Sequence, residues 1–255
     1  MKKRLLLGAG LLGVFGLSAL VHMPASFVYH TLGQYVAIPA QLRVDGIQGT
    51  LWQGRAAQVR WQRYDLGAVN WSLDIGALFS GRLQAQVRVG QGGGLVVGRG
   101  ILGLNRQGAF AQNVVASLSV EQILPWLPRP PVPLDVQGQV EFNIQHWDYQ
   151  APWCRSAKGS VVLNTQGVGT PIAELTTGPV VAPFTCQDSA LSVAGNQQSD
   201  QVESAFTLDL TPDRRYQTRA WFTPQSNFPP ALQEQLKWLP APTDGKHEFQ
   251  TTGQL

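Results

Sequence analysis

The chain has 255 residues, of which 44% are hydrophobic and only 14% are charged, against roughly 25% charged residues in a typical soluble domain. This composition excludes an intrinsically disordered chain and a long charged coiled coil, and the length suffices for one large domain or two small ones. Lys2, Lys3 and Arg4 account for the whole net charge of +3. The remaining residues are neutral overall, so the composition argues against a nucleic-acid-binding protein.

The charges beyond these three residues are divided unevenly along the chain. Residues 31–120 carry 8 Arg and 3 Asp, a net charge of +5, whereas residues 121–255 carry 8 basic and 13 acidic residues, a net charge of −5. Opposed charges fit a protein that stacks on itself or docks a partner at one end. A solvated surface without such a purpose explains them equally well.

The first predicted element is a transmembrane signal-anchor helix over residues 5–29. Residues 5–21 contain no charged side chain and follow the basic segment 1–4 directly, and about 20 apolar residues suffice to cross a bilayer as a helix. The basic segment is expected to stay in the cytoplasm, which places residues 30–255 across the membrane. The alternative is a cleaved signal peptide, although a good A-x-A cleavage site is missing.

Period-two alternation recurs through residues 30–255 and predicts β-strands. In residues 82–89, 136–144 and 206–210 every second residue is apolar, and most of the others are polar. Each such strand has one apolar and one polar face, which is typical of an antiparallel sheet packed on one side. Turn sequences such as Asp45-Gly46 and Thr243-Asp244-Gly245 separate these runs.

Only two or three short helices are expected beyond the anchor. The first covers residues 75–79, and the second follows Ser119 in a capping-box pattern. The third begins near Pro229 and repeats leucine at positions 232, 236 and 239. The sequence therefore predicts a mainly β fold, a curved antiparallel sheet or half-barrel, with a rigid Pro-rich seam at residues 128–133.

Cysteine usage fits an exported protein. Cys154 and Cys186 are the only cysteines and are 32 residues apart, without the CxxC spacing of a redox motif or zinc site. An exported pair usually forms a disulfide. Two unpaired buried thiols remain the alternative.

Motifs that would carry chemistry are absent or incomplete. No two histidines have the i, i+3 or i, i+4 spacing of a metal site on a helix. Residues 98–103 match GxGxxG, but no helix is expected to begin there, so these glycines are interpreted as part of a strand. No GxSxG elbow occurs. The sequence therefore predicts no catalytic, cofactor-binding or metal-binding residue, no cofactor, and no enzyme.

Tryptophan is abundant, with eight residues. These side chains could line an apolar groove or serve as aromatic anchors for a partner. Trp61 and Trp71 fit strand patterns and are expected in the core.

One block of sequence is more specific than the rest. It has the pattern G-T-L-W-x-G, then L-x-x-V-x-W-x-L, then L-x-x-G-x-L. Its characteristic residues are Gly49, Leu51, Trp52, Gly54, Trp71, Leu73, Gly81 and Leu83. This pattern resembles the type II secretion system protein N family, as do the basic N-terminal segment, the single apolar segment and the length. A looser likeness includes the segment after Cys154 and the pair Thr185-Cys186. Part of the pattern is shared with a wider group of AsmA-like membrane-anchored proteins.

The resemblance implies a single-pass inner-membrane protein with a periplasmic body. It would be a non-catalytic accessory component of the machine that exports folded proteins across the outer membrane, with other secretion subunits and the inner membrane as partners. The motif residues are then expected to be structural. The alternative is an AsmA-like periplasmic protein that binds or transfers lipid, which would show a continuous apolar face.

Overall fold

The computed structural model describes residues 14–16, 18–35, 41–91, 93–123 and 135–255. The described residues form one open antiparallel sheet with few short helices, as the mainly β prediction required. The strands follow one another in chain order from β1 to β8 and from β10 to β14, and β9 pairs with β8 alone. The chain divides into two compact units, residues 1–97 and 98–255, which are described separately. The seam expected at 128–133 lies outside the described residues.

The described part of the first unit starts with two helical segments that are separated at residues 22–24. Residues 14–16 and 18–21 are helical, His22 forms a turn, and Pro24 makes a β-bridge to Thr50. A second helix, α2, then covers Ala25–Tyr35. The prediction of one helix over residues 5–29 is therefore wrong at residues 22–24, because proline lacks an N–H and disfavours helical backbone in the preceding residue. Among the described residues, none of the helices combines the length and apolar character that a membrane span requires.

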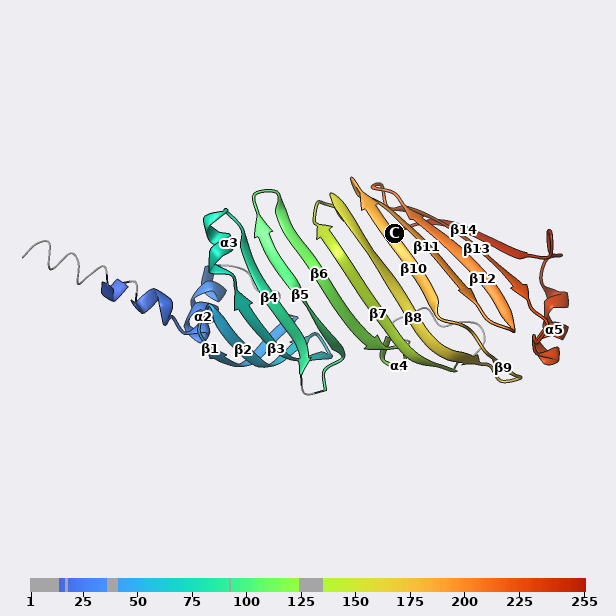
Figure 1. Ribbon diagram of the computed structural model, residues 1–255, viewed down its shortest axis with the longest axis horizontal. Coiled ribbons are helices and arrows are strands. Elements are labelled where there is room, and N and C mark those ends of the chain that lie inside the picture. Colours follow the sequence, from blue (N-terminus) through green and yellow to red (C-terminus); the bar gives the residue numbers. More distant parts are fainter. Residues whose placement is uncertain (1–13, 17, 36–40, 92, 124–134) are drawn as a thin grey trace, which may run out of the picture. The chain divides into compact units, whose positions relative to one another are not determined.

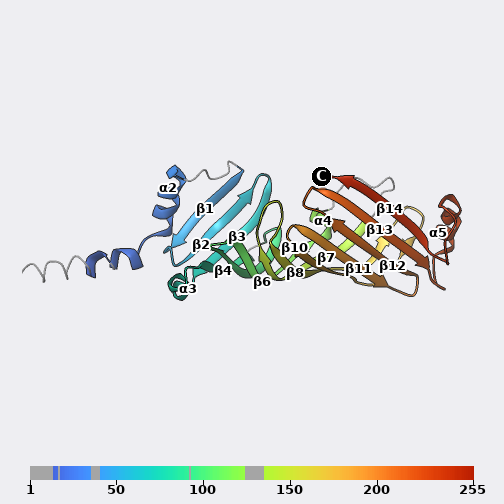
Figure 2. The same cartoon turned by 90° about the horizontal axis from the view of Figure 1, so that it is seen from above.

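Four complete strands form the sheet of the first unit, and neighbours in the chain pair antiparallel. They are β1 (Leu42–Gly49), β2 (Gln53–Trp61), β3 (Tyr64–Leu73) and β4 (Leu83–Gln91). Figure 2 shows β1, β2 and β3 side by side. The predicted helix over residues 75–79 is present as α3 (Ile75–Phe79), between β3 and β4.

The buried residues of this unit are small. Ala56, Val59, Ala68 and Ala77 are all at most 9% exposed. Trp61 was expected in the core, but it ends β2 opposite Tyr64 at the hairpin and is 40% exposed. Period-two alternation therefore identified this strand but not the burial of its last residue.

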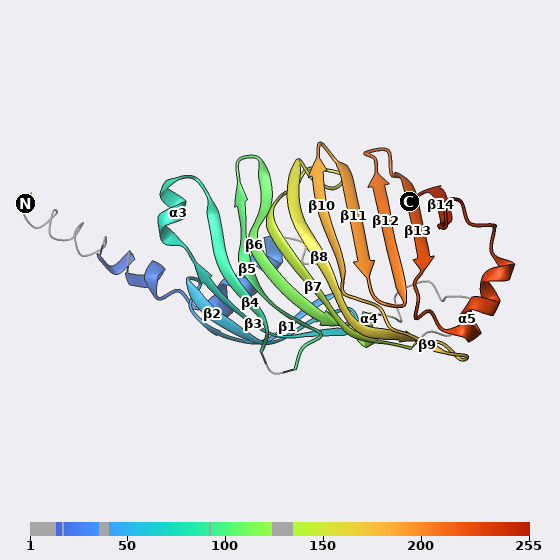
Figure 3. The same cartoon turned by 45° about the vertical axis from the view of Figure 1, so that its right-hand side comes forward.

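The second unit continues the meander with longer strands. These are β5 (Val96–Asn105, which contains the boundary between the units), β6 (Gly108–Ser119), β7 (Asp135–Asp148), β8 (Ser156–Gly169), β9 (Glu174–Leu175), β10 (Val180–Gln187), β11 (Ala190–Gln198), β12 (Val202–Leu210), β13 (Arg215–Pro224) and β14 (His247–Gln254). Figure 3 shows β7 and β8 bending along their length.

Short helices interrupt this meander at the positions expected. The helix after Ser119 is α4 (Val120–Ile123). The helix expected near Pro229 is α5 (Pro230–Gln235), and it tightens into the 3₁₀ turn η2 (Leu236–Trp238). The GxGxxG stretch lies in β5, where Gly98 and Gly100 lie against Ala116 and Val114 of β6. These glycines belong to a strand, and no helix begins at them.

Candidate functional site

The G-T-L-W-x-G motif forms the turn between β1 and β2. Gly49 and Gly54 are paired across the two strands, and the Thr50 N–H donates to the carbonyl oxygen of Gln53 at 2.8 Å. Gly49 has a φ of +87°, and a Cβ at this position would lie 2.5 Å from that same carbonyl oxygen. Only glycine combines this backbone conformation with such a close approach.

The tryptophan of the second part of the motif covers this turn. Trp71 on β3 is paired with Gly54, and a Cβ at Gly54 would collide with Cζ2 of the Trp71 ring. The indole N–H of Trp71 donates to the carbonyl oxygen of Leu51 at 3.1 Å. Because Gly54 has no side chain, the Trp71 ring can lie across β2. The hydrogen bond from this ring to Leu51 then stabilises the turn between β1 and β2.

The other tryptophan of the motif connects the turn to the N-terminal segment. The Trp52 indole N–H donates to the carbonyl oxygen of Leu20 at 2.9 Å. The backbone N–H of Leu51 donates to the carbonyl oxygen of Met23 at 3.0 Å, and Pro24 bridges to Thr50. We call residues 49–54 together with Trp71 the clasp, because they hold residues 20–24 at the turn between β1 and β2.

The last part of the motif ends helix α3. Gly81 has a φ of +71°. Its N–H donates to the carbonyl oxygen of Leu78 at 3.0 Å, and the Arg82 N–H donates to that of Ala77 at 3.1 Å. These two bonds form a Schellman motif, which favours glycine at its left-handed position. Leu73 ends β3 with its N–H bonded to the Trp52 carbonyl oxygen at 2.7 Å, and Leu83 begins β4 and is 45% exposed.

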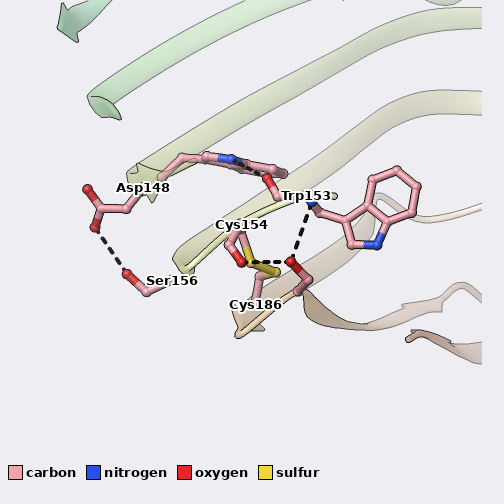
Figure 4. The surroundings of a disulfide bond; sticks show 7 residues. Asp148, Trp153, Cys154, Ser156 and Cys186 are labelled. Carbon is pink, nitrogen blue, oxygen red and sulfur yellow. Dashed lines mark hydrogen bonds between the residues drawn. A yellow bond between two sulfur atoms is a disulfide. The ribbon is translucent and has the colours of Figure 1, made fainter. Parts of the chain in front are cut away.

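The two cysteines lie in the second unit and form a disulfide. Cys154 is fully buried and Cys186 is 4% exposed, and their Cα atoms are 6.4 Å apart (Figure 4). Cys186 is paired with Ala157 on β8, so the bridge fastens the loop before β8 to β10. Ser189 donates its hydroxyl to the Cys154 carbonyl oxygen at 3.0 Å. The alternative of two unpaired thiols is thereby excluded.

Aromatic side chains surround this disulfide. Trp147 donates its indole N–H to the carbonyl oxygen of Trp153 at 3.1 Å, and its ring packs against that of Phe184 with centroids 6.1 Å apart. On the same side, Asp148 accepts a hydrogen bond from the Ser156 hydroxyl at 3.1 Å (Figure 4). The arrangement is a packed core, which identifies a stabilising element. Among the described residues, the Trp153 indole N–H is buried there without a hydrogen-bond partner.

An apolar groove lies at the other end of these strands. It has a volume of about 550 Å³. Its walls come from β7 to β13 on one side and from residues 228–239, which include α5 and η2, on the other. The described residues that line it include no charged side chain. Sequence analysis considered an apolar groove lined by tryptophans, but none of the described lining residues is a tryptophan. It predicted the leucines of the helical segment but not their position in a groove, because the strands that complete the groove are distant in the chain.

Three exposed carboxyl groups have a pKa below the ordinary value. A hydrogen bond from Gln58 lowers the pKa of Asp65, one from Gln84 lowers that of Asp74, and one from Thr211 lowers that of Asp213. In each case, backbone N–H groups or a nearby arginine lower the pKa further. Asp65 lies in β3 beside the β2–β3 hairpin, Asp74 caps the N-terminus of α3, and Asp213 lies in the turn between β12 and β13. Among the residues that the structure describes, His, Cys, Asp and Glu form no group that could hold a metal ion.

Comparison with known proteins gives the same family for nearly the whole chain. Residues 40–250 match the family described as type II secretion system (T2SS), protein N. The chain is 43% identical over 240 residues to the type II secretion system protein N of Vibrio cholerae, covering 93% of each chain. It is 28% identical over 251 residues to that of Aeromonas hydrophila, covering 98% of this chain and 97% of the relative. No solved structure matches. The chain therefore belongs to the type II secretion system protein N family.

Proposed function

We propose that the protein is a non-catalytic accessory component of the type II secretion system, anchored in the inner membrane. It aids export of folded proteins across the outer membrane by docking to other secretion subunits. The likeness to the Vibrio cholerae protein, 43% identity over 93% of both chains, carries this proposal. The family match over residues 40–250 includes the motif block and both cysteines.

The anchor is proposed for the apolar segment that begins at Leu5. We end the proposed span at Val21, before the turn at His22, instead of at residue 29. Because Lys2, Lys3 and Arg4 precede it, the N-terminus stays in the cytoplasm and the sheet lies in the periplasm. The clasp supports this arrangement, since it fixes the chain to the sheet directly after the apolar segment.

The disulfide supports the periplasmic location independently. Disulfides persist in the bacterial periplasm and are rare in the cytoplasm, where thiols are kept reduced. Cys154 and Cys186 are buried together in the core of the second unit. A body that depends on this bridge is suited to an oxidising compartment.

The absence of a chemical step is also part of the proposal. The carboxyl groups with lowered pKa values, Asp65, Asp74 and Asp213, each accept a hydrogen bond from a backbone N–H or a side chain within three residues in the sequence. Groups used in this way are suited to a structural role, since a general acid or base at neutral pH needs a raised pKa.

The proposal is tested in two ways: by deleting the protein from cells and measuring secretion, and by identifying the proteins that co-purify with it. Cells that lack the protein are expected to release less exoprotein, and the full-length chain restores release. Purification of the full-length chain from native membranes in mild detergent, followed by mass spectrometry, is expected to recover other inner-membrane secretion subunits. Stoichiometric phospholipid without any secretion subunit would contradict the proposal and favour the lipid-handling alternative.

A matched pair of variants tests whether the clasp contributes to function. Trp52→Phe keeps an aromatic ring but removes the hydrogen bond to Leu20, and it is expected to restore secretion only in part. Trp238→Phe makes the same chemical change at a residue that is 85% exposed in η2, and it is expected to restore secretion fully. Equal restoration by both variants would show that the clasp is dispensable.

A further inference from the structure

Helix α3 of the first unit exposes its apolar face. Ile75, Leu78 and Phe79 stand at positions i, i+3 and i+4, which lie on one face of a helix. Their exposed fractions are 49%, 39% and 92%, whereas Ala77 is 6% exposed. A surface helix of a soluble domain ordinarily packs such a face against the core. Three large apolar side chains on one exposed face therefore indicate a contact surface.

Hydrogen bonds at both ends hold α3 in this position. The Asp74 carboxylate accepts the N–H groups of Gly76 and Ala77, and it also accepts the side-chain N–H of Gln84 at 2.9 Å. Gly81 ends the helix in the Schellman motif described above. These donors compensate the Asp74 charge, so the carboxylate can approach an apolar surface at a reduced desolvation cost.

Hydrogen bonds also connect α3 to the end of the proposed membrane span. Trp52 of the clasp donates its indole N–H to the carbonyl oxygen of Leu20, next to Val21, at 2.9 Å. The carbonyl oxygen of Trp52 accepts the N–H of Leu73, two residues before α3 begins. Two Cα steps of about 3.8 Å and a cross-strand distance of about 5.5 Å place the start of α3 within about 13 Å of Trp52. Figure 1 shows α3 on the side of the first unit from which the N-terminal segment extends.

This distance is short in relation to a bilayer. The hydrocarbon core is about 30 Å thick and the whole bilayer about 40–45 Å, so each headgroup region is about 5–8 Å deep. Tryptophan is enriched at this level of a membrane. An amphipathic helix that lies on a membrane buries its apolar face about 5–10 Å into the boundary between headgroups and acyl chains. The clasp therefore places α3 where such a contact can form.

The size of the apolar face favours a lipid surface over a second protein. A stable protein interface buries about 800 Å² on each partner, from about 20–30 residues. The face of α3 consists of three side chains, and the neighbouring Leu83 is 45% exposed. A bilayer needs no complementary shape, because the hydrophobic effect is not directional.

Charge at this end of the sheet agrees with a phospholipid surface. Arg82 directly follows Gly81 and is exposed. The ion pairs found among the described residues both lie in the second unit, so Arg82 forms none there. Its guanidinium can therefore bind a lipid phosphate through charge-assisted hydrogen bonds.

We propose that α3 is a second membrane contact of this chain. Ile75, Leu78 and Phe79 enter the boundary between headgroups and acyl chains on the periplasmic side of the inner membrane, and Arg82 binds a lipid phosphate. This proposal rests on the inner-membrane anchor proposed above. A single span leaves the sheet free to swing about the point where the chain leaves the bilayer, and a contact at α3 restricts that motion.

A spin label on α3 tests the contact in phospholipid nanodiscs. Both native cysteines form the disulfide, so one introduced cysteine in the full-length chain takes the label selectively. The measured quantity is the collision rate of the label with O₂ relative to a water-soluble nickel chelate. We expect this ratio to be about fivefold higher at Ile75→Cys than at Trp61→Cys, because a contact of this kind is about 5–10 Å deep. Trp61 ends β2, about 26 Å along the strand from the clasp. Equal ratios at the two positions would overturn the proposal.

Discs that hold one copy of the purified chain exclude a protein as the source of the signal. A raised ratio that is found only in discs with several copies would assign the face to a second copy of the chain. A raised ratio that is found only in native membranes would assign it to a secretion subunit. Either result would overturn the lipid contact.

A label in the anchor separates this inference from the proposed function. Val14 is helical and 69% exposed, and it lies within the proposed span. The label at Val14→Cys is expected deep in the bilayer. A deep label at Val14 with a water-exposed label at Ile75 would overturn the second contact and leave the anchor intact. A water-exposed label at Val14 would contradict the anchor, and the second contact with it.

Two exposed phenylalanines provide a matched pair of variants. Phe79 is 92% exposed on α3, and Phe249 is 42% exposed on β14 of the second unit. In the Ile75→Cys chain, Phe79→Ser is expected to lower the collision ratio to the level of Trp61→Cys, and Phe249→Ser is expected to leave it unchanged. An unchanged unfolding temperature shows that the Phe79→Ser chain is folded. An unchanged ratio in that folded chain would contradict the proposed contact.

Discussion

Glycine in a strand is paired with an aromatic ring at four places among the described residues. The pairs are Gly54–Trp71, Gly159–Phe184, Gly195–Phe206 and Gly253–Tyr216. In each pair a Cβ on the glycine would collide with the ring of its partner. Glycine weakens a strand when nothing covers it, and an aromatic side chain laid across it offsets that loss.

The pair Gly54–Trp71, which belongs to the clasp, is the one for which a substitution is most informative. Gly54→Ala is expected to lower the free energy of unfolding of the first unit by about 1–3 kcal/mol, because the new methyl group displaces the Trp71 ring. Urea unfolding followed by tryptophan fluorescence measures this change.

A double-mutant cycle shows whether the ring is the cause. In a Trp71→Ala background the added methyl group has no ring to displace, so Gly54→Ala should cost little there. The same loss in both backgrounds would mean that the clash with the Gln48 carbonyl oxygen dominates, and that the ring is not the reason for glycine.

At the scale of elements, α3 is a five-residue helix with both ends capped. The Asp74 carboxylate accepts the N–H of Gly76 at 2.9 Å and that of Ala77 at 3.3 Å, and Gly81 closes the other end. Short helices are marginal by themselves. The caps explain why five residues with no buried side chain but Ala77 are helical.

The pKa of Asp74 makes this cap sensitive to acid. The hydrogen bond from Gln84 lowers the pKa most, followed by that from the Ala77 N–H. A pKa lowered by folding stabilises the protein above the unfolded value of 3.8, and this contribution is lost as the pH falls through the folded value. Asp74→Asn is therefore expected to reduce the difference in urea midpoint between about pH 6 and about pH 3. A difference as large as that of the wild type would contradict this role.

The disulfide joins two further elements, the loop before β8 and strand β10. Its 32-residue separation predicts a contribution of roughly 3–4 kcal/mol in the chain-entropy model. Replacing Cys154 and Cys186 together by alanine is expected to lower the free energy of unfolding of the second unit by that amount. Reductant should destabilise the wild type similarly and leave the double variant unchanged, and a stable reduced wild type would refute the estimate.

At the scale of the whole molecule, the sheet is a meander in which strands pair with neighbours in the sequence. The exception is β9, which pairs only with β8, so that β8 continues to β10. In such a sheet, stability is approximately a sum of local terms, because each strand contacts only the strands beside it. A local change should therefore have local consequences.

Hydrogen exchange measured by mass spectrometry tests this expectation. Gly54→Ala should accelerate amide exchange in β1, β2 and β3, roughly 5–30-fold for a loss of 1–2 kcal/mol. Exchange around Cys154 and Cys186 should stay unchanged. Faster exchange across both units would show that the sheet unfolds as one cooperative body.

Local sequence patterns predicted much of the fold because their causes are local. Alternation identified the strand at 136–144, the run of residues 75–79 indicated α3, and the leucine repeat that begins at Leu232 indicated the helix near Pro229. The helix over 5–29 was extended too far because Pro24 was not weighed against the apolar run. Trp61 was assigned to the core because alternation does not show where a sheet ends.

The sequence by itself determined the strand alternation, the pair of cysteines, the short helices and the family pattern. Each depends on residues near one another in the chain or on a likeness of the chain as a whole. Only the tertiary structure decided that Trp71 lies over Gly54 and that Trp52 forms a hydrogen bond with Leu20. It also decided that residues 228–239 lie opposite β7 to β13 across a groove. These contacts depend on strand register, which is set by the summed packing of both faces and which no local sequence pattern records.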